Sequence, residues 1–169
     1  MDTKEPSFSH LGPGGEAAMV NVGGKAVTRR RAVAEGWIRM DASTLERIEA
    51  RRIRKGDVLA VARIAAVGGA KRAAELIPLC HPLPIDGIEV EIELRPERPG
   101  VRLQVAVNAE ARTGVEMEAL CGVAAGLLAT YDMCKSVERG MTIEAIELVS
   151  KEGGASGAWR REPRNRPGM

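Results

Sequence analysis

Two alternating stretches decide the fold: IEVEIEL at residues 88–94 and VRLQVAV at residues 101–107. Apolar and acidic residues alternate throughout the first stretch, and apolar and polar residues alternate over the first five positions of the second. Because successive strand residues point to opposite faces of a sheet, each pattern predicts a strand with one face on a core. The six residues between them, RPERPG, predict that the two strands form a hairpin.

Helical patterns precede this hairpin. Residues 41–53 are predicted to be helical, with Ser43 as the cap and Glu46 closing a capping box. Asp57 is predicted to cap a second helix, whose small and apolar residues continue to the proline at position 78.

A third helix is predicted over residues 114–140, with Thr113 and Glu116 in capping-box spacing at its start. Residues 141–150 alternate again and predict a last strand, and residues 26–40 are interpreted as an extended segment ahead of the helices. This order matches the split β-α-β-β-α-β pattern. We therefore predict an α+β protein: a ferredoxin-like antiparallel sheet with helices packed on one face, plus an N-terminal extended segment.

Length and composition fit one domain of 169 residues. We predict a flexible N-terminus at residues 1–16, a single α+β domain at residues 17–157 and a basic, flexible tail at residues 158–169. A net charge of +2 gives no global attraction to nucleic acid. No secretory signal opens the chain and no apolar run approaches the roughly 20 residues of a membrane span, so we expect a cytoplasmic protein without a membrane partner.

The three cysteines, Cys80, Cys121 and Cys134, form no C-x-x-C pair, which favours reduced thiols over a disulfide framework or a structural zinc site. Aromatic residues make up only 2% of the chain. The core must then consist of small aliphatic residues, which is weak support for an oligomer that buries further surface between subunits.

The stretch LIPLCHPLPI, residues 76–85, holds His81 between prolines. A residue before proline is pushed toward extended backbone, and Ile77, His81 and Leu83 all precede prolines. The imidazole is therefore held on a stiff, non-helical segment. Such a segment could present His81 to a ligand, or it could be a connector whose histidine fills a hydrogen-bonding niche.

The stretch TGVEMEAL, residues 113–120, contains two carboxylates. Capping explains Glu116, whereas Glu118 points to another face of the helix and has no capping role. Met117 is expected to belong to the core rather than to contact a ligand. The free amide groups at this helix start could also bind an oxygen-rich ligand.

The stretch TYDMCKS, residues 130–136, places Asp132 and Lys135 three residues apart on one helix. They could form a solvated ion pair worth a few tenths of a kcal/mol. Alternatively, apolar neighbours could lower the pKa of Lys135 toward about 7 to 8, where a lysine acts as a general acid or base. Two further lysines, Lys55 and Lys151, stand at element boundaries, Lys151 before glycines that could hold phosphate or simply be flexible.

No P-loop, G-x-S-x-G, H-E-x-x-H or dinucleotide motif is present in the sequence. One histidine, two or three lysines and several carboxylates suit acid–base chemistry on a polar, phosphorylated small molecule. The residues alone predict nothing more specific.

The motifs LIPLCHPL, TGVEMEAL, YDMCKS and KEGG, in this order and spacing and with KGD and the ARIA run upstream, resemble cyclic pyranopterin monophosphate synthase, the C protein of molybdenum cofactor biosynthesis, called the MoaC family. The likeness extends from about His10 to Gly157. It implies a lyase that converts a cyclised dihydro-GTP into cyclic pyranopterin monophosphate and releases diphosphate. It also implies a homohexamer, a trimer of dimers with sites at subunit interfaces. No resident cofactor is expected, although Mg²⁺ could accompany the substrate phosphates.

The resemblance also implies roles for individual residues. Asp132, Lys135 and Lys55 match the catalytic residues of the family, and Lys151 matches a lysine near its site. The positions that match its substrate-contacting stretches are Leu79, Cys80, His81, Glu116, Met117 and Glu118.

Asn21 and Gly23 depart from the family pattern, which has aspartate and serine at these positions. The asparagine removes a charge, so any ion pair of that aspartate is lost here. A non-catalytic nucleotide- or pterin-binding oligomer is the alternative function, because fold alone does not decide catalysis. An RNA-binding sheet is disfavoured, since the chain has too few aromatic residues for base stacking.

Overall fold

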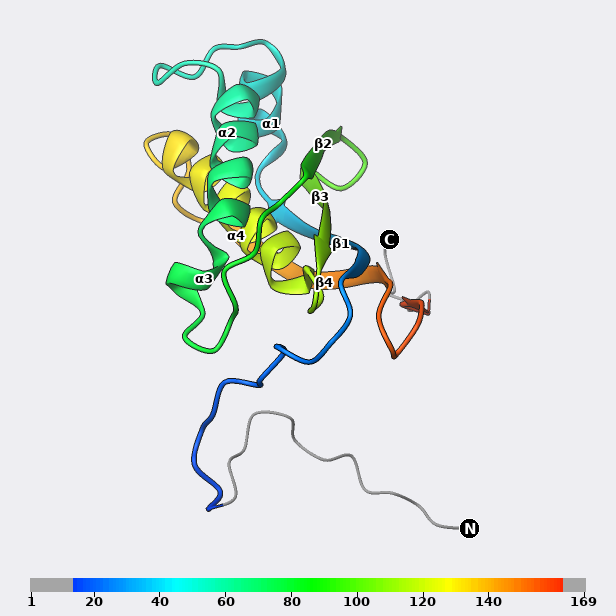
Figure 1. Cartoon of the computed structure of the whole chain (residues 1–169). Coiled ribbons are helices and arrows are strands. Elements are labelled where there is room, and N and C mark those ends of the chain that lie inside the picture. Colours follow the sequence, from blue (N-terminus) through cyan, green and yellow to red (C-terminus); the bar gives the residue numbers. More distant parts are fainter. Residues whose placement is uncertain (1–13, 163–169) are drawn as a thin grey trace.

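The computed structural model describes residues 14–162 (Figure 1). Its elements follow the chain as β1 (Thr28–Arg39), α1 (Ala42–Glu49), α2 (Val58–Lys71), α3 (Ala73–Leu76), β2 (Gly87–Arg95), β3 (Gly100–Ala111), α4 (Glu116–Cys134), β4 (Thr142–Glu152) and β5 (Trp159–Arg160). The predicted flexible N-terminus lies almost entirely outside the described residues, as does the end of the predicted tail.

The strands form one antiparallel sheet in the order β2-β3-β1-β4-β5. The first four strands have the order of a split β-α-β-β-α-β fold, so the predicted ferredoxin-like architecture is confirmed. The predicted hairpin is β2 and β3, with Ile88 opposite Val107 and Leu94 opposite Val101. Their alternation places β3 residues such as Leu103 in the core.

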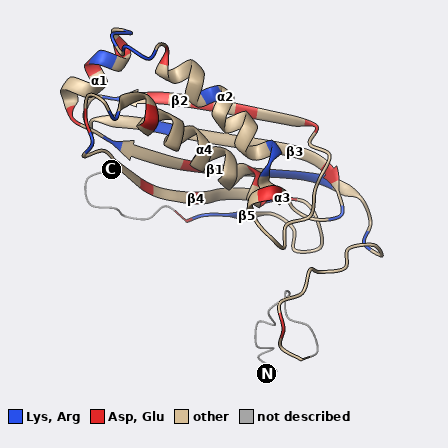
Figure 2. Cartoon of the chain, turned by 90° about the vertical axis from the view of Figure 1, so that its left-hand side faces the viewer, with Lys and Arg blue, Asp and Glu red and all other residues tan. Residues whose placement is uncertain are grey.

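The helices α2 and α4 cover one face of this sheet (Figures 1 and 2). They approach closely because glycines lie at their contact. A Cβ on Gly69 would stand 2.4 Å from the Cβ of Ala125 and 2.7 Å from the carbonyl oxygen of Cys121. A Cβ on Gly126 would stand 3.2 Å from the Cβ of Ala66. This contact sets where both ends of α4 lie relative to α2.

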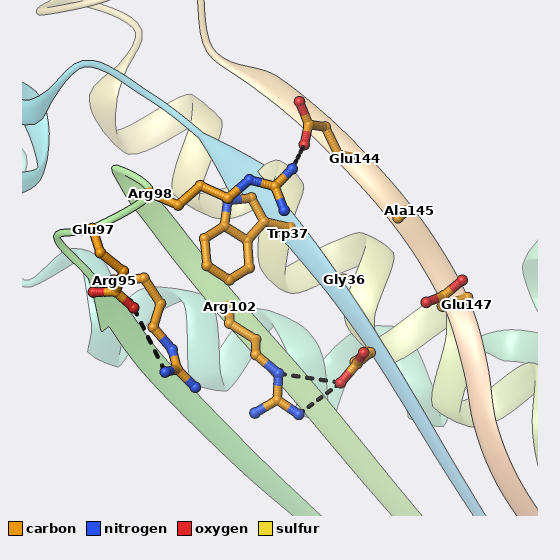
Figure 3. A pocket seen from close by; sticks show the side chains of 10 residues that line it. Gly36, Trp37, Arg95, Glu97, Arg98, Arg102, Glu144, Ala145 and Glu147 are labelled. Carbon is orange, nitrogen blue, oxygen red and sulfur yellow. Dashed lines mark hydrogen bonds and ion pairs between the residues drawn. The ribbon is translucent and has the colours of Figure 1, made fainter. Parts of the chain in front are cut away.

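The other face of the sheet carries charged side chains. Arg102 pairs with Glu35 at 2.6 Å, and Arg98 pairs with Glu144 at 2.6 Å. Figure 3 shows Arg98 reaching Glu144 across the Trp37 ring, whose centroid lies 5.2 Å from the Arg98 guanidinium carbon. The cavity of about 310 Å³ among these residues is lined by charges that already have partners.

Of the three predicted helix caps, the structure confirms one and contradicts two. Asp57 does cap α2, since its Oδ1 accepts a hydrogen bond from the Ala60 amide at 3.0 Å. Ser43 does not cap α1, because the helix already begins at Ala42 and Asp41 is its N-cap. Thr113 does not cap α4 either, because the N-cap is Val115 and no side chain caps it. Capping therefore does not explain Glu116.

Two helix ends also differ from the predictions. The second predicted helix breaks at Arg72 into α2 and the short α3, and Ile77 is extended, as expected for a residue before proline. The third ends at Cys134, six residues before Gly140. Within residues 14–162, α4 is the one helix long and apolar enough to cross a membrane, and more than half of it is buried as a core helix. The three cysteines are free thiols.

Candidate functional site

The carboxyl end of α4 brings three predicted site residues together. Asp132 Oδ1 lies 2.6 Å from Lys135 Nζ, and its Oδ2 lies 2.9 Å from Lys55 Nζ. Lys55 also donates to the backbone carbonyl of Asp132 at 2.6 Å. Because Lys55 precedes α2 and Asp132 lies in the last turn of α4, the packing of these helices joins residues 77 positions apart. One carboxylate thus holds two ammonium groups.

These contacts set the protonation of the group. Hydrogen bonds from Lys135 and then Lys55 lower the pKa of Asp132 to about 2. The hydrogen bond to Asp132 raises the pKa of Lys135, so the predicted lowering of that pKa is wrong. The reason is that the Lys135 side chain is half exposed and its nearest charge is a carboxylate. At neutral pH Lys135 is a cation, able to donate a proton.

The amino end of α4 holds a carboxylate in the opposite environment. Glu118 is only 3% exposed, and burial raises its pKa. The Cys80 thiol donates to Glu118 Oε1 at 3.7 Å, and within residues 14–162 no group donates to Oε2. Burial also raises the pKa of Cys80 to about 11. This end therefore contains a thiol that stays protonated at neutral pH. Beside it lies a carboxyl group, one oxygen of which is buried without a donor.

The loop that carries Cys80 also carries Leu79 and His81, and all three are partly buried. The His81 imidazole makes no hydrogen bond or ion pair to another residue in the described part of the chain. The described chain thus offers the imidazole no hydrogen-bonding niche, and the contact of His81 with a ligand stays a prediction. Met117 is partly exposed and does not belong to the core, contrary to the prediction.

A third group surrounds a cavity of about 590 Å³ between the starts of β1 and α4 and the end of β4. Glu116 lines it, as does Lys151, which donates to Ser156 and to the carbonyl oxygen of Gly157, the latter at 2.8 Å. Sequence analysis missed Lys25, Arg30 and Arg112, which also line this cavity. One signal in the sequence could have indicated Arg30. It alternates with Ala32 and Ala34, which face the core, and therefore lies on the same face of the strand.

Asn21, which replaces the aspartate of the family pattern, forms a local turn. Its Oδ1 accepts a hydrogen bond from the Gly23 amide at 2.8 Å. A carboxylate of the same shape could accept that bond too, so the asparagine preserves the turn while it removes the charge.

The predicted residues do not all meet within one chain. Asp132 follows Glu116 by 16 positions and Glu118 by 14 on one continuous helix. At 1.5 Å per residue, the two ends are about 21–24 Å apart. The structure therefore assembles Lys55 with Asp132 and Lys135, and Cys80 with Glu118, but keeps the two groups apart. No three side chains among residues 14–162 are placed to share a metal ion.

The ferredoxin-like sheet with helices on one face defines an α+β protein, in which two lysines meet one carboxylate and several cations line one cavity. The MoaC family model matches residues 19–154, and the chain belongs to this family of molybdenum cofactor biosynthesis. All the candidate site residues, from Lys55 to Lys151, lie within the matched span.

Proposed function

We propose that this chain is a cyclic pyranopterin monophosphate synthase, which converts cyclised dihydro-GTP into cyclic pyranopterin monophosphate and releases diphosphate. The observation that carries the proposal is the contact of Lys55 and Lys135 with one carboxylate, Asp132. Rebuilding the purine-derived ring requires protons to be delivered and removed, and groups positioned for such transfer contribute about 10²–10⁴-fold to rate.

The contacts suggest a division of labour. Lys135, whose pKa is raised, is protonated in the resting state. Asp132 fixes both ammonium groups and stays ionised, since its own pKa is about 2. When a substrate oxygen or nitrogen replaces part of this contact, the lysine is already oriented toward it.

The separation of the two groups favours a site completed by a second copy of the chain. Met117, Ala124, Leu128 and Asp132 recur at helical spacing and lie on one face of α4, with Leu128 59% exposed. On α2, Ile64 is 73% exposed. A two-fold axis near Ala124 would pair two α4 helices antiparallel and set Asp132 of one beside Met117 and Glu118 of the other.

Such pairs are the dimer unit of the proposed homohexamer, a trimer of dimers, and we propose that it acts in the cytoplasm. The exposed apolar residues on α2 and α4 supply the surface that an antiparallel pair would bury.

The reaction is tested anaerobically with purified protein and the cyclised intermediate, by following diphosphate and the fluorescent pterin formed on oxidation of the product. We expect turnover that falls at least about 100-fold in Lys135→Ala. The matched control is Arg139→Ala, which removes an exposed cation just beyond the same helix end. Binding without turnover in the wild type would instead support the non-catalytic oligomer.

Complementation tests the shared site. Lys135→Ala and Glu118→Gln are each expected to be inactive, because each damages one half of every site. Random mixing makes half of the dimers heterodimers with one intact site, so about a quarter of wild-type activity should return. Heterodimers isolated with two different tags that remain inactive would contradict a site shared across this axis.

A further inference from the structure

We propose that the loop between α1 and α2, residues 50–56, is an encounter surface for polyanionic ligands. It draws them toward the group of Lys55, Asp132 and Lys135 by long-range attraction and does not itself hold them once bound. The identity of the polyanion, the cyclised triphosphate, rests on the proposed function. The attraction itself rests on the charges of the loop, its fixed backbone and the conformation of Arg51.

The loop carries cations and no carboxylate. Its sequence is ARRIRKG, in which Arg51, Arg52 and Arg54 precede Lys55. All three arginines are exposed, and none of their side chains has an ion pair or hydrogen bond to another residue within 14–162. Lys55 differs, because it contacts Asp132 at 2.9 Å. Figure 2 shows the basic residues of this loop between α1 and α2, at one end of the molecule. The loop therefore presents three positive charges that the described chain does not neutralise.

The backbone of the loop is fixed where it leaves α1. The Arg51 N–H donates to the carbonyl oxygen of Ile48 at 3.0 Å, and the Arg52 N–H donates to the carbonyl oxygen of Arg47 at 2.8 Å. These two bonds form the Schellman motif, which ends a helix with one residue in the left-handed conformation. Ile53, in the middle of the loop, is only 5% exposed and anchors it to the core. The arginine side chains therefore extend from a backbone that is held in place.

Arg51 occupies the position of this motif that favours glycine. Its φ is +52°, in the left-handed region where a Cβ crowds the following carbonyl oxygen. Glycine is the usual residue there because it has no Cβ. An arginine at this position costs stability, and its side chain makes no contact in the described chain that would offset the cost. Backbone strain of this kind clusters at functional sites, so we ascribe the arginine to its charge.

The loop is close enough to the lysine group to attract the same ligand. Arg54 adjoins Lys55 in the chain and Arg51 is four residues from it, so their Cα atoms lie within about 15 Å of that of Lys55. At low ionic strength the Debye length exceeds this distance, and the charges act together. A surface of one charge sign raises the association rate of oppositely charged ligands about 10–10³-fold under such conditions. A polyanion gains most, because the attraction grows with its charge.

Stopped-flow mixing of the full chain with a fluorescent derivative of GTP tests the encounter surface without any turnover, since it measures association and dissociation rates separately. The test variant combines Arg51→Gln, Arg52→Gln and Arg54→Gln. At about 0.01 M salt, where the Debye length is about 30 Å, we expect this variant to associate at least about tenfold more slowly than the wild type. At about 1 M salt, where the Debye length is about 3 Å, the difference should fall below about twofold. The dissociation rate should change less than about twofold at either salt concentration, because the arginines do not hold the bound ligand.

Arg51→Gly separates the charge from the fold. Glycine relieves the left-handed strain, so the unfolding temperature should rise by a few degrees, while association at low salt should slow about twofold because one cation is lost. Arg51→Lys keeps the charge and should associate like the wild type. Arg95→Gln is the matched control, since it removes one partly exposed cation from the other face of the sheet, and it should leave the association rate unchanged.

Several outcomes would overturn the encounter surface. They are undetectable association of the GTP derivative with the wild type, an unchanged rate in the triple variant at low salt, and equal slowing by Arg51→Gly and Arg95→Gln. A loss that persists at about 1 M salt, or that appears in the dissociation rate, would instead place the arginines in the binding site itself and would also contradict the proposal. If the loop speeds association but the cyclised nucleotide is never turned over, only the proposed function fails. If turnover is normal and association ignores the loop, only the encounter surface fails.

Discussion

The two ends of α4 hold carboxylates in opposite states. At the carboxyl end, Asp132 is exposed to solvent, contacts two lysines and has a pKa of about 2. At the amino end, Glu118 is buried and accepts a weak hydrogen bond from the Cys80 thiol, and burial raises its pKa. In the proposed site shared by two copies of the chain, carboxyl groups that differ in this way would keep one ionised and let the other exchange a proton.

The difference also shows which end is complete. The Asp132 contacts satisfy both of its oxygens, so this end needs no ligand to hold its geometry. Glu118 leaves a buried oxygen without a donor in the described chain, and such an atom costs about 1–3 kcal/mol. A substrate N–H group that donates to Glu118 would remove this cost, so we propose that a ligand completes the amino end.

The largest expected effect comes from breaking the charged end. Asp132→Asn should reduce turnover about 10²–10⁴-fold, because the neutral amide no longer attracts and orients the side chains of Lys55 and Lys135. The measurement is diphosphate release under anaerobic conditions. Glu49→Gln serves as the control, since Glu49 is an exposed carboxylate on α1. If the Asp132→Asn protein turned over normally, Asp132 would have no role in the reaction.

The next effect comes from disturbing the contact between α2 and α4. Gly69→Ala would place a methyl group 2.4 Å from the Ala125 Cβ. Overpacking of this kind costs about 1–3 kcal/mol, so the free energy of unfolding in urea should fall by that amount. At Gly68 nothing lies within 4 Å of an added Cβ, and Gly68→Ala should stabilise the helix by about 0.5–1 kcal/mol. Equal effects at the two positions would show that the helix contact is looser than the structure indicates.

The sequence predicted the architecture because alternation and helical spacing are local signals. The β2–β3 hairpin was visible in residues 88–107, and Asp57 was a correct cap. The start of α4 was misplaced because Thr113 and Glu116 match a capping box by spacing alone, whereas the helix begins after Val115. Spacing does not show where the backbone enters the helix.

The site was only half predictable for a related reason. The pairing of Asp132 with Lys135 follows from helical spacing, but the contact with Lys55 depends on how α2 packs on α4. The Arg30 cavity is still more remote, because it joins β1, β4 and the start of α4. Contacts between elements distant in sequence require the tertiary structure.

A smaller effect should appear when the buried end is neutralised. The folded pKa of Glu118 is raised above its unfolded value, so ionisation destabilises the folded protein as pH rises past the unfolded value of about 4.3. Glu118→Gln should therefore raise the unfolding temperature at pH 8 by a few degrees and change it little at pH 4. A stabilisation that is the same at both pH values would mean that folding does not raise the pKa of Glu118.

The smallest effect concerns the thiol that donates to Glu118. The Cys80 hydrogen bond lowers the pKa of Glu118 against the effect of burial, so its removal in Cys80→Ala should raise that pKa. A hydroxyl is a stronger donor than a thiol, so Cys80→Ser should lower it. Each variant is compared with its own Glu118→Gln partner in thermal unfolding from pH 4 to pH 8, since the double-mutant cycle isolates the pair. Shifts in opposite directions identify the hydrogen bond as the cause. Shifts in the same direction would mean that both substitutions act by admitting water to the Glu118 carboxyl, and the contrast between the two ends of α4 would then depend on burial alone.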